Sequence, residues 1–493
     1  MGKDEKLNLA SAETFSLRAI IPQLLAIIVG MIMVILDSTA MNVAIPSLVK
    51  DLNSDLDTIK WTITGYTLAM SAVIPLAGWL SDRIGAKRVF LISITLFTIG
   101  SALCAIAQSP SELIVFRMLQ GLGGGMVAPV GMAMVFSLAP PEKRGAVMGF
   151  LGIPILLGPA LGPILSGYLV EYQSWHWIFL INLPVGIAAV IMIQFLIPKS
   201  KRSEKIPHLD WKGMILAPIA FAMLAYGISE SGTSWTSTST LTGLIVGGIA
   251  LILFIISSLS QKQPLLELRV FRSSDFTRSI LLLWVVMFAM FGVMVMVPLF
   301  LQNVKGYSAL ETGVMLLPQA LMAGLCMPIS GKLFDKIGAR PLALIGLSSI
   351  TAAMFVLSSV TVDTGKLVIL IALGLMGVGM GFTMMPLNTH VMNSSPRHLV
   401  SRVTSLTTAA QQVVVSFAVT VLTTYLTSQA AEHLKTAGNA ANPLESMVQG
   451  FGDTFNLVAW IAAAGILFAL FLRKPKQAPD EGDGQNTPSV MIH

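Results

Sequence analysis

Two charged side chains stand inside apolar runs of the sequence, Asp37 in the first run and Arg117 in the fourth. An ionised group at membrane depth is costly and rare, so each is a candidate functional residue. At a rise of ~1.5 Å per residue, Asp37 lies about 14 Å from the end of its run near Pro46, and Arg117 about 8 Å from the start of its run near Glu112. Gln120, one turn beyond Arg117, reaches the depth of Asp37. The two charges can therefore meet if their helices touch.

This pair of charges suggests a proton carrier. Burial disfavours the ionised form of the Asp37 carboxyl group, whereas a neighbouring Arg117 favours it. A carboxylate held between these effects can be tuned to titrate near physiological pH. A cationic substrate would favour ionised Asp37 and protonation would expel that substrate, which is antiport in its simplest form. The alternative is a buried ion pair that only fixes helix packing.

The elements that must position these residues are membrane helices. The chain has 493 residues, of which 54% are hydrophobic and 11% charged, whereas soluble domains carry about 25% charged residues. A helix needs ~20 apolar residues to cross a bilayer, and only helices or closed barrels do so. We predict an all-α membrane protein with fourteen spans at 20–45, 61–80, 89–107, 113–138, 146–170, 177–197, 213–228, 241–258, 279–301, 309–331, 342–360, 367–392, 403–426 and 455–472.

The connections between these runs predict the orientation of the chain. With both termini in the cytoplasm, 25 of the 31 Lys and Arg residues fall on the cytoplasmic side and five on the outer side. This asymmetry is typical of a multi-pass protein with cytoplasmic termini. Because the charges are scattered over short loops, they do not indicate a nucleic-acid partner.

An internal repeat groups the fourteen runs. Residues 78–87 follow the second run and residues 331–340 follow the tenth, and six of the ten positions are identical. The copies stand eight runs apart instead of six, so two runs are inserted between two homologous six-helix bundles. We therefore expect a cytoplasmic N-tail at 1–19, bundles at 20–197 and 279–472, a linker with the two inserted spans at 198–278, and a disordered cytoplasmic tail at 473–493.

Several kinds of chemistry are excluded by residue type and spacing. Cys104 and Cys326 both fall in apolar runs, and CxxC or other zinc-ligand spacings are absent from the sequence. The glycine run 121–125 lies within a span, and no P-loop surrounds Gly331. We therefore expect neither an enzyme nor a cofactor, and we expect a proton gradient as the energy source.

The sequence resembles the major facilitator superfamily, and within it the fourteen-span branch of drug:proton antiporters. The resemblance covers nearly the whole chain and rests on six motifs: the turn 78–87, Arg117-x-x-Gln120-Gly121, Gly158-Pro159-x-x-Gly162, and the segments 36–46, 175–184 and 298–310. It implies the major facilitator fold, a location in the cell membrane of a bacterium, and alternating access to a midplane site. In this reading Asp37, Arg117 and Gln120 couple protons to substrate.

The resemblance also implies a conformational gate at the repeated turns, which would hold the cytoplasmic side closed. Basic residues at cytoplasmic turns are also explained by membrane topology alone. Asp82 is acidic, so topology does not account for it. The candidate partner helix begins near Ser401 and Arg402. The gate residues are Gly78, Asp82, Arg83, Gly85, Lys87, Arg88, Asp335 and Arg340.

The fifth run is the helix associated with export-type antiporters, through Gly158, Pro159 and Gly162. Small residues four apart let helices approach closely, and ordinary membrane-helix packing is the alternative explanation. Further polar groups that could face a cavity are Asn42, Gln319, Asn388, Gln411 and Gln412. His390, near the predicted cytoplasmic end of its run, is expected to be an interfacial, hydrogen-bonded residue.

The predicted function is proton-coupled export of hydrophobic drugs or toxic compounds, neutral or carrying one positive charge. A single deep carboxylate suits such substrates better than dications. One alternative keeps the fold and exports an endogenous lipid or metabolite. A second alternative is a membrane receptor or scaffold that transports nothing. The sequence does not identify an accessory protein partner.

Overall fold

The computed structural model describes residues 17–198, 210–232, 234–261, 263–396, 399–437 and 442–472. Over these ranges the chain forms only helices and the turns that join them. Most of the predicted N-tail and the whole predicted disordered tail at 473–493 lie outside the described residues, so neither prediction is tested.

The helices follow the predicted runs. The first half contains α2 (Leu17–Asp51), α3 (Leu56–Val73), α4 (Leu76–Ile84), α5 (Ala86–Ala105), α6 (Pro110–Leu138), the short η1 (Pro141–Lys143), α7 (Arg144–Tyr172), α8 (His176–Leu180) and α9 (Asn182–Leu196). Next come α10 (Trp211–Glu230), α11 (Thr238–Ser260) and η2 (Leu268–Arg272). The second half contains α12 (Ser274–Asn303), α13 (Ala309–Ile337), α14 (Ala339–Ser358), α15 (Lys366–Asn393), α16 (Val400–Ala437) and α17 (Pro443–Ala469).

By length and composition, 12 of the described helices can cross a membrane, or 13 when the bent pair α3–α4 counts as one span. The fifth predicted run corresponds to α7, a helix of 29 residues. The count of fourteen spans therefore stays a prediction. The bend of 51° between α3 and α4 was not predicted. It occurs at Pro75, which has no backbone N–H to continue the helical ladder.

The repeated turns have the same backbone geometry in both halves. Gly85 joins α4 to α5 with φ 92°, and Gly338 joins α13 to α14 with φ 79°. Residues with a Cβ rarely adopt a positive φ, so glycine is needed at both corners. The backbone thus supports the repeat that the sequence showed.

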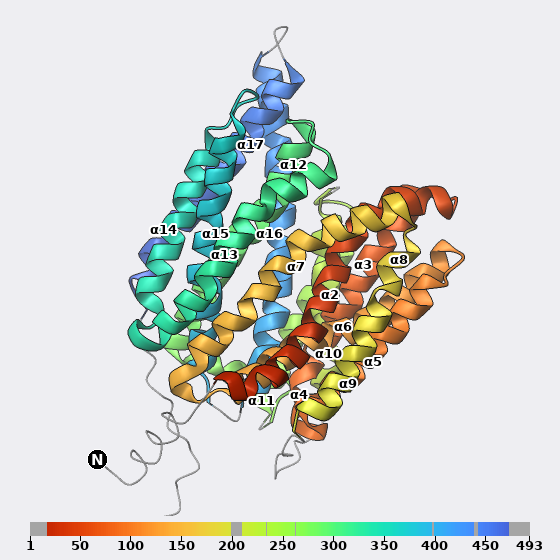
Figure 1. The fold of residues 1–493 in the computed structure, drawn as a ribbon, viewed down its shortest axis with the longest axis vertical. Helices are drawn as coiled ribbons and strands as arrows, with labels where there is room; N and C mark the ends of the chain where they lie inside the picture. The colour runs from red at the N-terminus through yellow and green to blue at the C-terminus, as the bar shows by residue number, and fades with distance from the viewer. Residues whose placement is uncertain are drawn as a thin grey trace, which may run out of the picture.

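The two halves meet at the end of the molecule that carries these turns. Figure 1 shows their helices converging toward the lower end and diverging toward the upper end. At the lower end α7 packs along α13, and α16 packs on α4 and α6. A Cβ at Gly145 would lie 2.4 Å from the Gly331 oxygen, and one at Gly78 would lie 2.6 Å from the Ser401 oxygen. Only glycine permits these backbone contacts.

The pair α10–α11, which the sequence predicts to be an insertion, touches both halves. Its helix α10 packs against α11, α3 and α16. The ring of Tyr226 lies 6.0 Å from that of Trp61 of α3, and Thr420 of α16 donates a hydrogen bond of 3.1 Å to the Ile228 oxygen. The insertion is therefore attached across the boundary between the halves.

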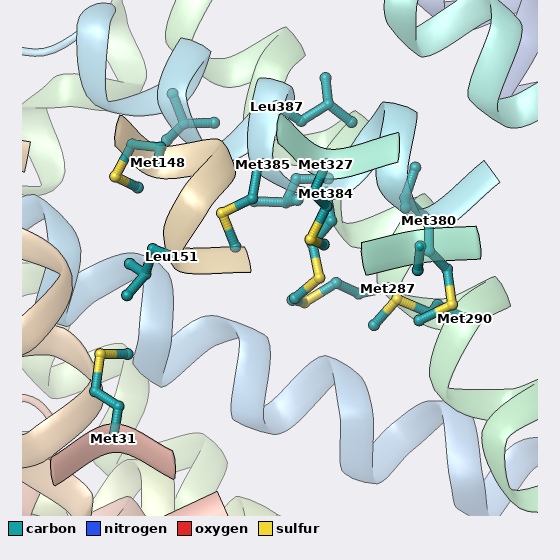
Figure 2. Close-up of a cluster of buried hydrophobic side chains, with 14 of the residues drawn as sticks. Met31, Met148, Leu151, Met287, Met290, Met327, Met380, Met384, Met385 and Leu387 are labelled. Atoms are coloured by element: carbon teal, nitrogen blue, oxygen red, sulfur yellow. The ribbon is translucent and has the colours of Figure 1, made fainter. Parts of the chain in front are cut away.

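Methionines fill the contact between the halves above the lower end. Figure 2 shows Met148 of α7, Met327 of α13 and Met385 of α15 among further methionines of α12 and α15. All three are at most 1% exposed. Methionine side chains are unbranched and adapt to irregular gaps, so this contact can repack more readily than one built from branched residues.

Candidate functional site

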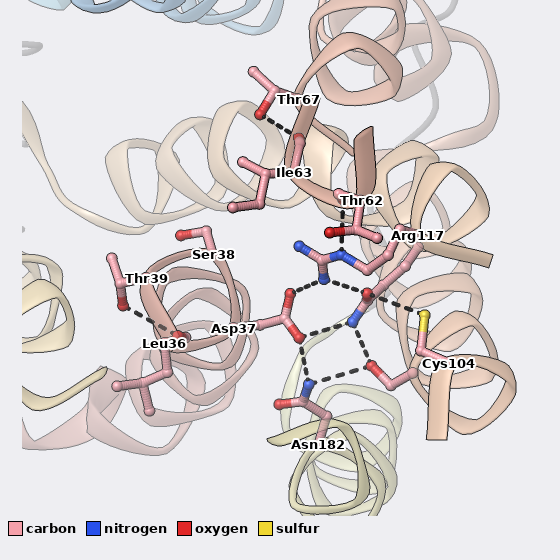
Figure 3. Close-up of polar contacts among 12 residues, drawn as sticks. Leu36, Asp37, Ser38, Thr39, Thr62, Ile63, Thr67, Cys104, Arg117 and Asn182 are labelled. Atoms are coloured by element: carbon pink, nitrogen blue, oxygen red, sulfur yellow. Dashed lines mark hydrogen bonds and ion pairs between the residues drawn. The ribbon is translucent and has the colours of Figure 1, made fainter. Parts of the chain in front are cut away.

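Asp37 lies at the convergence of four helices. Its carboxylate faces Arg117 and Gln120 of α6, Asn182 of α9 and, one contact further, Ser101 of α5 (Figure 3). Arg117 and Gln120 are three residues apart, so they share one face of α6. The structure therefore brings together the three residues that the sequence predicted as the coupling group.

Both oxygens of the carboxylate accept hydrogen bonds. Oδ2 accepts from Arg117 Nη1 at 2.6 Å. Oδ1 accepts from Gln120 Nε2 at 2.9 Å and from Asn182 Nδ2 at 2.8 Å. Ser101 Oγ accepts from Gln120 at 2.6 Å and from Asn182 at 3.3 Å. This network orients the side-chain donors of Arg117, Gln120 and Asn182 toward the Asp37 carboxyl group.

The arginine is as deeply buried as its partner. Arg117 is 1% exposed and Asp37 is 2% exposed. The guanidinium also donates to the Thr62 oxygen at 3.3 Å and to Gln120 Oε1 at 2.6 Å, and it stacks 4.0 Å from the centre of the Tyr66 ring. The site therefore holds two opposite charges with zero net charge.

This arrangement links protonation to helix contacts. A proton on Asp37 would leave the charge of Arg117 unpaired, and an unpaired buried charge costs about 3–5 kcal/mol. The protonated oxygen would also lose its role as acceptor for one of its donors. Because Asp37 belongs to α2 and its donors to α6 and α9, the ion pair and the hydrogen bonds join these three helices.

The fifth predicted run connects this site to the other half of the molecule. A Cβ at Gly158 would meet Ile35 of α2 at 2.5 Å, and one at Gly162 would meet Thr39 at 2.0 Å. The glycines nearer the start of α7 face α13 instead. Pro159 lies in α7 between Gly158 and Gly162, and its side chain is outside the described residues. One helix thus contacts both the Asp37 helix and the opposite half.

The first repeated turn contacts the start of α16, as the sequence suggested. Asp82 Oδ2 accepts a hydrogen bond of 2.9 Å from Arg402 Nε. The same guanidinium donates to the Pro264 oxygen at 3.1 Å, in the segment that follows the inserted helices. Asp82 and Arg402 therefore join the first half, the insertion and the second half.

The second turn makes the equivalent contact in the opposite direction. Asp335 accepts from the backbone nitrogens of Gly145 at 2.8 Å and Ala146 at 3.0 Å, at the start of α7. A carboxylate at a helix N-terminus satisfies free N–H groups and complements the helix dipole. Next to it, Arg144 donates to Asn393 of α15 at 2.9 Å. Each half therefore places one carboxylate on the first turn of a helix of the other half.

The other gate candidates differ in their contacts. Gly78 packs against Ser401 of the second half, as described above. Lys87 donates to the Gln194 and Ile197 oxygens at 2.8 and 2.5 Å, so it caps the end of α9 in its own half. Arg83 lies 5.1 Å from the centre of the Trp79 ring. Arg88 and Arg340 are exposed.

The polar residues proposed for a cavity are scattered. Gln411 Nε2 lies 3.5 Å from Asn388 Oδ1, which pairs α16 with α15. Gln319 donates to the sulfur of Met380 at 3.2 Å. Gln412 is half-buried, and the hydrogen bond to Asn388 comes from its neighbour Gln411. The side chain of Asn42 lies outside the described residues.

The expectation of a hydrogen-bonded His390 was wrong. The residue is 1% exposed, and neither ring nitrogen has a hydrogen-bond partner within the described part of the chain. It is a buried histidine of α15 and not a hydrogen-bonded one in the described structure, and its predicted place near the membrane interface stays a prediction.

Asn182 and Ser101 were missed as site residues. Asn182 stands in the segment 175–184 that was quoted for its resemblance, so a polar residue within that motif was the available signal. Ser101 is a small hydroxyl within a span and gives no such signal, since serines of this kind usually bond to their own helix.

Sequence comparison identifies known proteins that resemble this chain. The sequence profile described as Major Facilitator Superfamily matches residues 27–419. The chain is 35% identical over 407 residues to the "Multidrug resistance protein B homolog" of Mycobacterium tuberculosis, covering 82% of this chain and 75% of that one. It is 30% identical over 464 residues to the "Lincomycin resistance protein LmrB" of Bacillus subtilis, covering 93% of this chain and 96% of that one.

The fold is also that of a solved transporter. The crystal structure of the human organic anion transporter MFSD10 (TETRAN) matches with a TM-score of 0.64 at 14% identity. The match covers 89% of this chain and 98% of that one.

Proposed function

This chain belongs to the Major Facilitator Superfamily, and from that premise we propose that it exports lipophilic small molecules in exchange for protons. The family and the fold are those of multi-pass membrane transporters and not of enzymes. The observation that carries the proposal is the buried carboxylate of Asp37, held by Arg117, Gln120 and Asn182.

In the proposed cycle Asp37 carries the proton. In the deprotonated form of this cycle the carboxylate and Arg117 pair across α2 and α6, and the 2.6 Å contact between them supports this assignment. Uptake of a proton from outside breaks this pair and favours the rearrangement that exposes the site to the cytoplasm. Loss of the proton there restores the pair, while substrate bound from the inner side is released outward.

The gate proposal rests on the two carboxylates at the lower end. The Lys and Arg distribution supports both termini in the cytoplasm; in that orientation this end is the cytoplasmic one, and we propose that the structure represents the outward-facing state. The contacts of Asp82 with Arg402 and of Asp335 with the start of α7 then hold the cytoplasmic side closed. Opening toward the cytoplasm requires both contacts to break.

The substrate class is supported by the names of relatives and by the site. Both bacterial relatives are named for resistance to drugs, and one is named for lincomycin. A site with one carboxylate and one arginine suits neutral lipophiles and monocations. Export of an endogenous lipid or metabolite would use the same machinery, and the two cases differ only in the compounds that respond.

The proposal is tested in inside-out vesicles that hold a pH gradient reported by a fluorescent pH probe. Addition of ethidium or Nile red should dissipate the gradient with the wild-type protein. Asp37→Asn should abolish this response, whereas Gln319→Leu, which removes a polar group away from the site, should keep it within about twofold. Asp37→Glu retains the charge and shows whether a loss comes from chemistry or from misfolding. An unchanged response with Asp37→Asn contradicts the proposal.

A further inference from the structure

A pocket of about 240 Å³ is lined in part by Asp37. It is enclosed by α2, α7 and the α8–α9 pair, and both α7 and α9 pack against α2. Most of its wall is apolar and includes Leu36 of α2, Leu165 and Leu169 of α7 and Val185 of α9. The proposed transport cycle assigns no role to this space.

Three polar side chains interrupt the apolar wall. Two of them, Asp37 and Asn182, are hydrogen-bonded to each other. The third is Ser166 of α7, which is fully buried and whose Oγ has no hydrogen-bond partner among the described residues. A buried hydroxyl without a partner costs about 1–3 kcal/mol. A ligand in the pocket that carries a hydrogen-bonding group would remove this cost.

While Asp37 is paired with Arg117, as in this structure, the charge of the site favours an uncharged ligand in this pocket, whatever the charge of the transported substrate. The Asp37 carboxylate is already neutralised by Arg117, and its two oxygens accept three hydrogen bonds in total. A cation in the pocket would lose its hydration and meet a site of zero net charge. Desolvation of an unpaired ion is unfavourable, whereas a neutral hydroxyl or carbonyl needs only one hydrogen-bond partner.

The position of the pocket indicates that the ligand comes from the bilayer. Figure 1 shows α7, α2 and α9 from the side, running obliquely across the part of the molecule nearest the viewer. Around the pocket, Leu161 of α7 and Ile187 of α9 expose 40% and 56% of their surface, as expected for residues that face lipid. The pocket is smaller than the ~300–1,000 Å³ typical of sites that hold a whole drug-sized molecule. It therefore accommodates only part of a ligand, with the rest in the membrane.

We propose that this pocket binds an uncharged amphiphile from the bilayer, with its hydrogen-bonding group on Ser166 and its apolar chain between α7 and α9. The site is argued from its own lining, and it stands whether or not Asp37 carries a proton. Occupancy would place a ligand directly against Asn182, one of the three donors to Asp37.

The test uses the purified full chain in phosphatidylcholine nanodiscs and a long-chain alcohol that carries a photoreactive diazirine. After irradiation, mass spectrometry maps the adducts. Residues 161–169 and 178–185 should carry at least fivefold more adducts than α11, whose exposed Ile245, Ile249, Ile252 and Ile256 report ordinary contact with lipid. A diazirine alkane without the hydroxyl should show less than half of this enrichment.

Two variants at one position separate filling of the pocket from loss of the hydroxyl. Ser166→Phe should reduce the enrichment to the level of α11, and Leu161→Phe, on the exposed face of the same helix, should leave it unchanged. Ser166→Ala keeps the space and should reduce labelling by the alcohol about threefold without changing labelling by the alkane. If Ser166→Phe does not fold, Ser166→Ala decides the question. Equal labelling of α7, α9 and α11, or enrichment that neither variant changes, overturns the proposal.

Discussion

At the scale of residues, the site combines one ion pair with two amides that have different functions. Gln120 both donates to Asp37 and accepts from Arg117, so it bridges the charges. Asn182 donates to Asp37 and to Ser101, and it comes from a different helix. Hydrogen bonds to a charged group contribute about 1.5–3 kcal/mol each. The amides therefore fix the position of the carboxylate relative to Arg117.

Asn182→Leu provides a prediction at this scale. The substitution removes one donor to the ionised carboxylate and leaves the protonated form less affected. If Asp37 carries the proton as proposed, transport should then need a lower proton concentration. The pH of half-maximal proton-coupled transport should move upward by about one unit, which corresponds to the loss of about 1.4 kcal/mol of interaction with the carboxylate. Transport measured over a pH series checks this shift. Gln319→Leu should leave the profile in place, and a loss of activity with an unmoved profile would indicate a purely structural role for Asn182.

The sequence predicted the charges of the site better than its neutral members. Asp37 and Arg117 were recognisable because charge within an apolar run is rare. Ser101 and Ser166 were not recognisable, because hydroxyls in membrane helices are common and usually bond to their own backbone. Their significance depends on which helices meet, and this is information that local sequence does not contain.

At the scale of elements, α7 connects the parts of the molecule. Glycines at its start face α13 in the opposite half, and glycines further along face α2 and the Asp37 region. The same helix also contains Gly167, where a Cβ would have no neighbour within 4 Å. The helix therefore contains glycines in close contact with neighbouring helices and one glycine, Gly167, with open space around it, and the two kinds can be compared directly.

Gly149→Ala and Gly167→Ala should have opposite effects. A Cβ at Gly149 would lie 2.6 Å from the Met327 oxygen of α13, so alanine should push the halves apart at the lower end. At Gly167 alanine meets nothing and should stabilise the helix by about 0.5–1 kcal/mol. Spin labels at Arg88→Cys and Arg340→Cys, both exposed positions, report the distance between the two halves by double electron–electron resonance. Cys104 and Cys326 are replaced by alanine for this measurement. Only Gly149→Ala should increase the population in which the two labels are far apart. Equal distance distributions in the two variants would contradict this prediction.

The elements themselves were largely predictable from hydrophobic runs, and their breaks were less so. The bend at Pro75 and the interruption at Ile181 both fall inside runs that read as single spans. Apolar composition reports burial in lipid or protein but not the direction of the helix axis. The close contacts of α10 with both halves were also unpredictable, because they depend on how the bundles face each other.

At the scale of the whole molecule, the two halves are held together by a pair of related contacts. Asp82 reaches from the first half to Arg402, and Asp335 reaches from the second half to the start of α7. The repeat in the sequence predicted that the two turns would correspond. It did not predict that each carboxylate would engage the opposite half in a different way, one through a guanidinium and one through backbone nitrogens.

Asp82→Asn and Asp335→Asn should have additive effects. Each variant weakens one contact at the same end, and distant sites without shared partners usually contribute independently. If each shifts the open-to-closed ratio at that end about tenfold, or about 1.4 kcal/mol, the double variant should shift it about a hundredfold. The same spin-label pair measures all three populations. A double variant that matches either single variant would show that one contact alone holds this end.

The position of α10 bears on the rate of transport. This helix is attached to α3 through an aromatic contact and to α16 through a hydroxyl hydrogen bond. In the proposed transport cycle α3 and α16 belong to halves that tilt against each other, so one of these two contacts has to break in every cycle. We therefore expect α10 to slow transport, and variants that weaken the contact of Thr420 or Trp61 should transport faster.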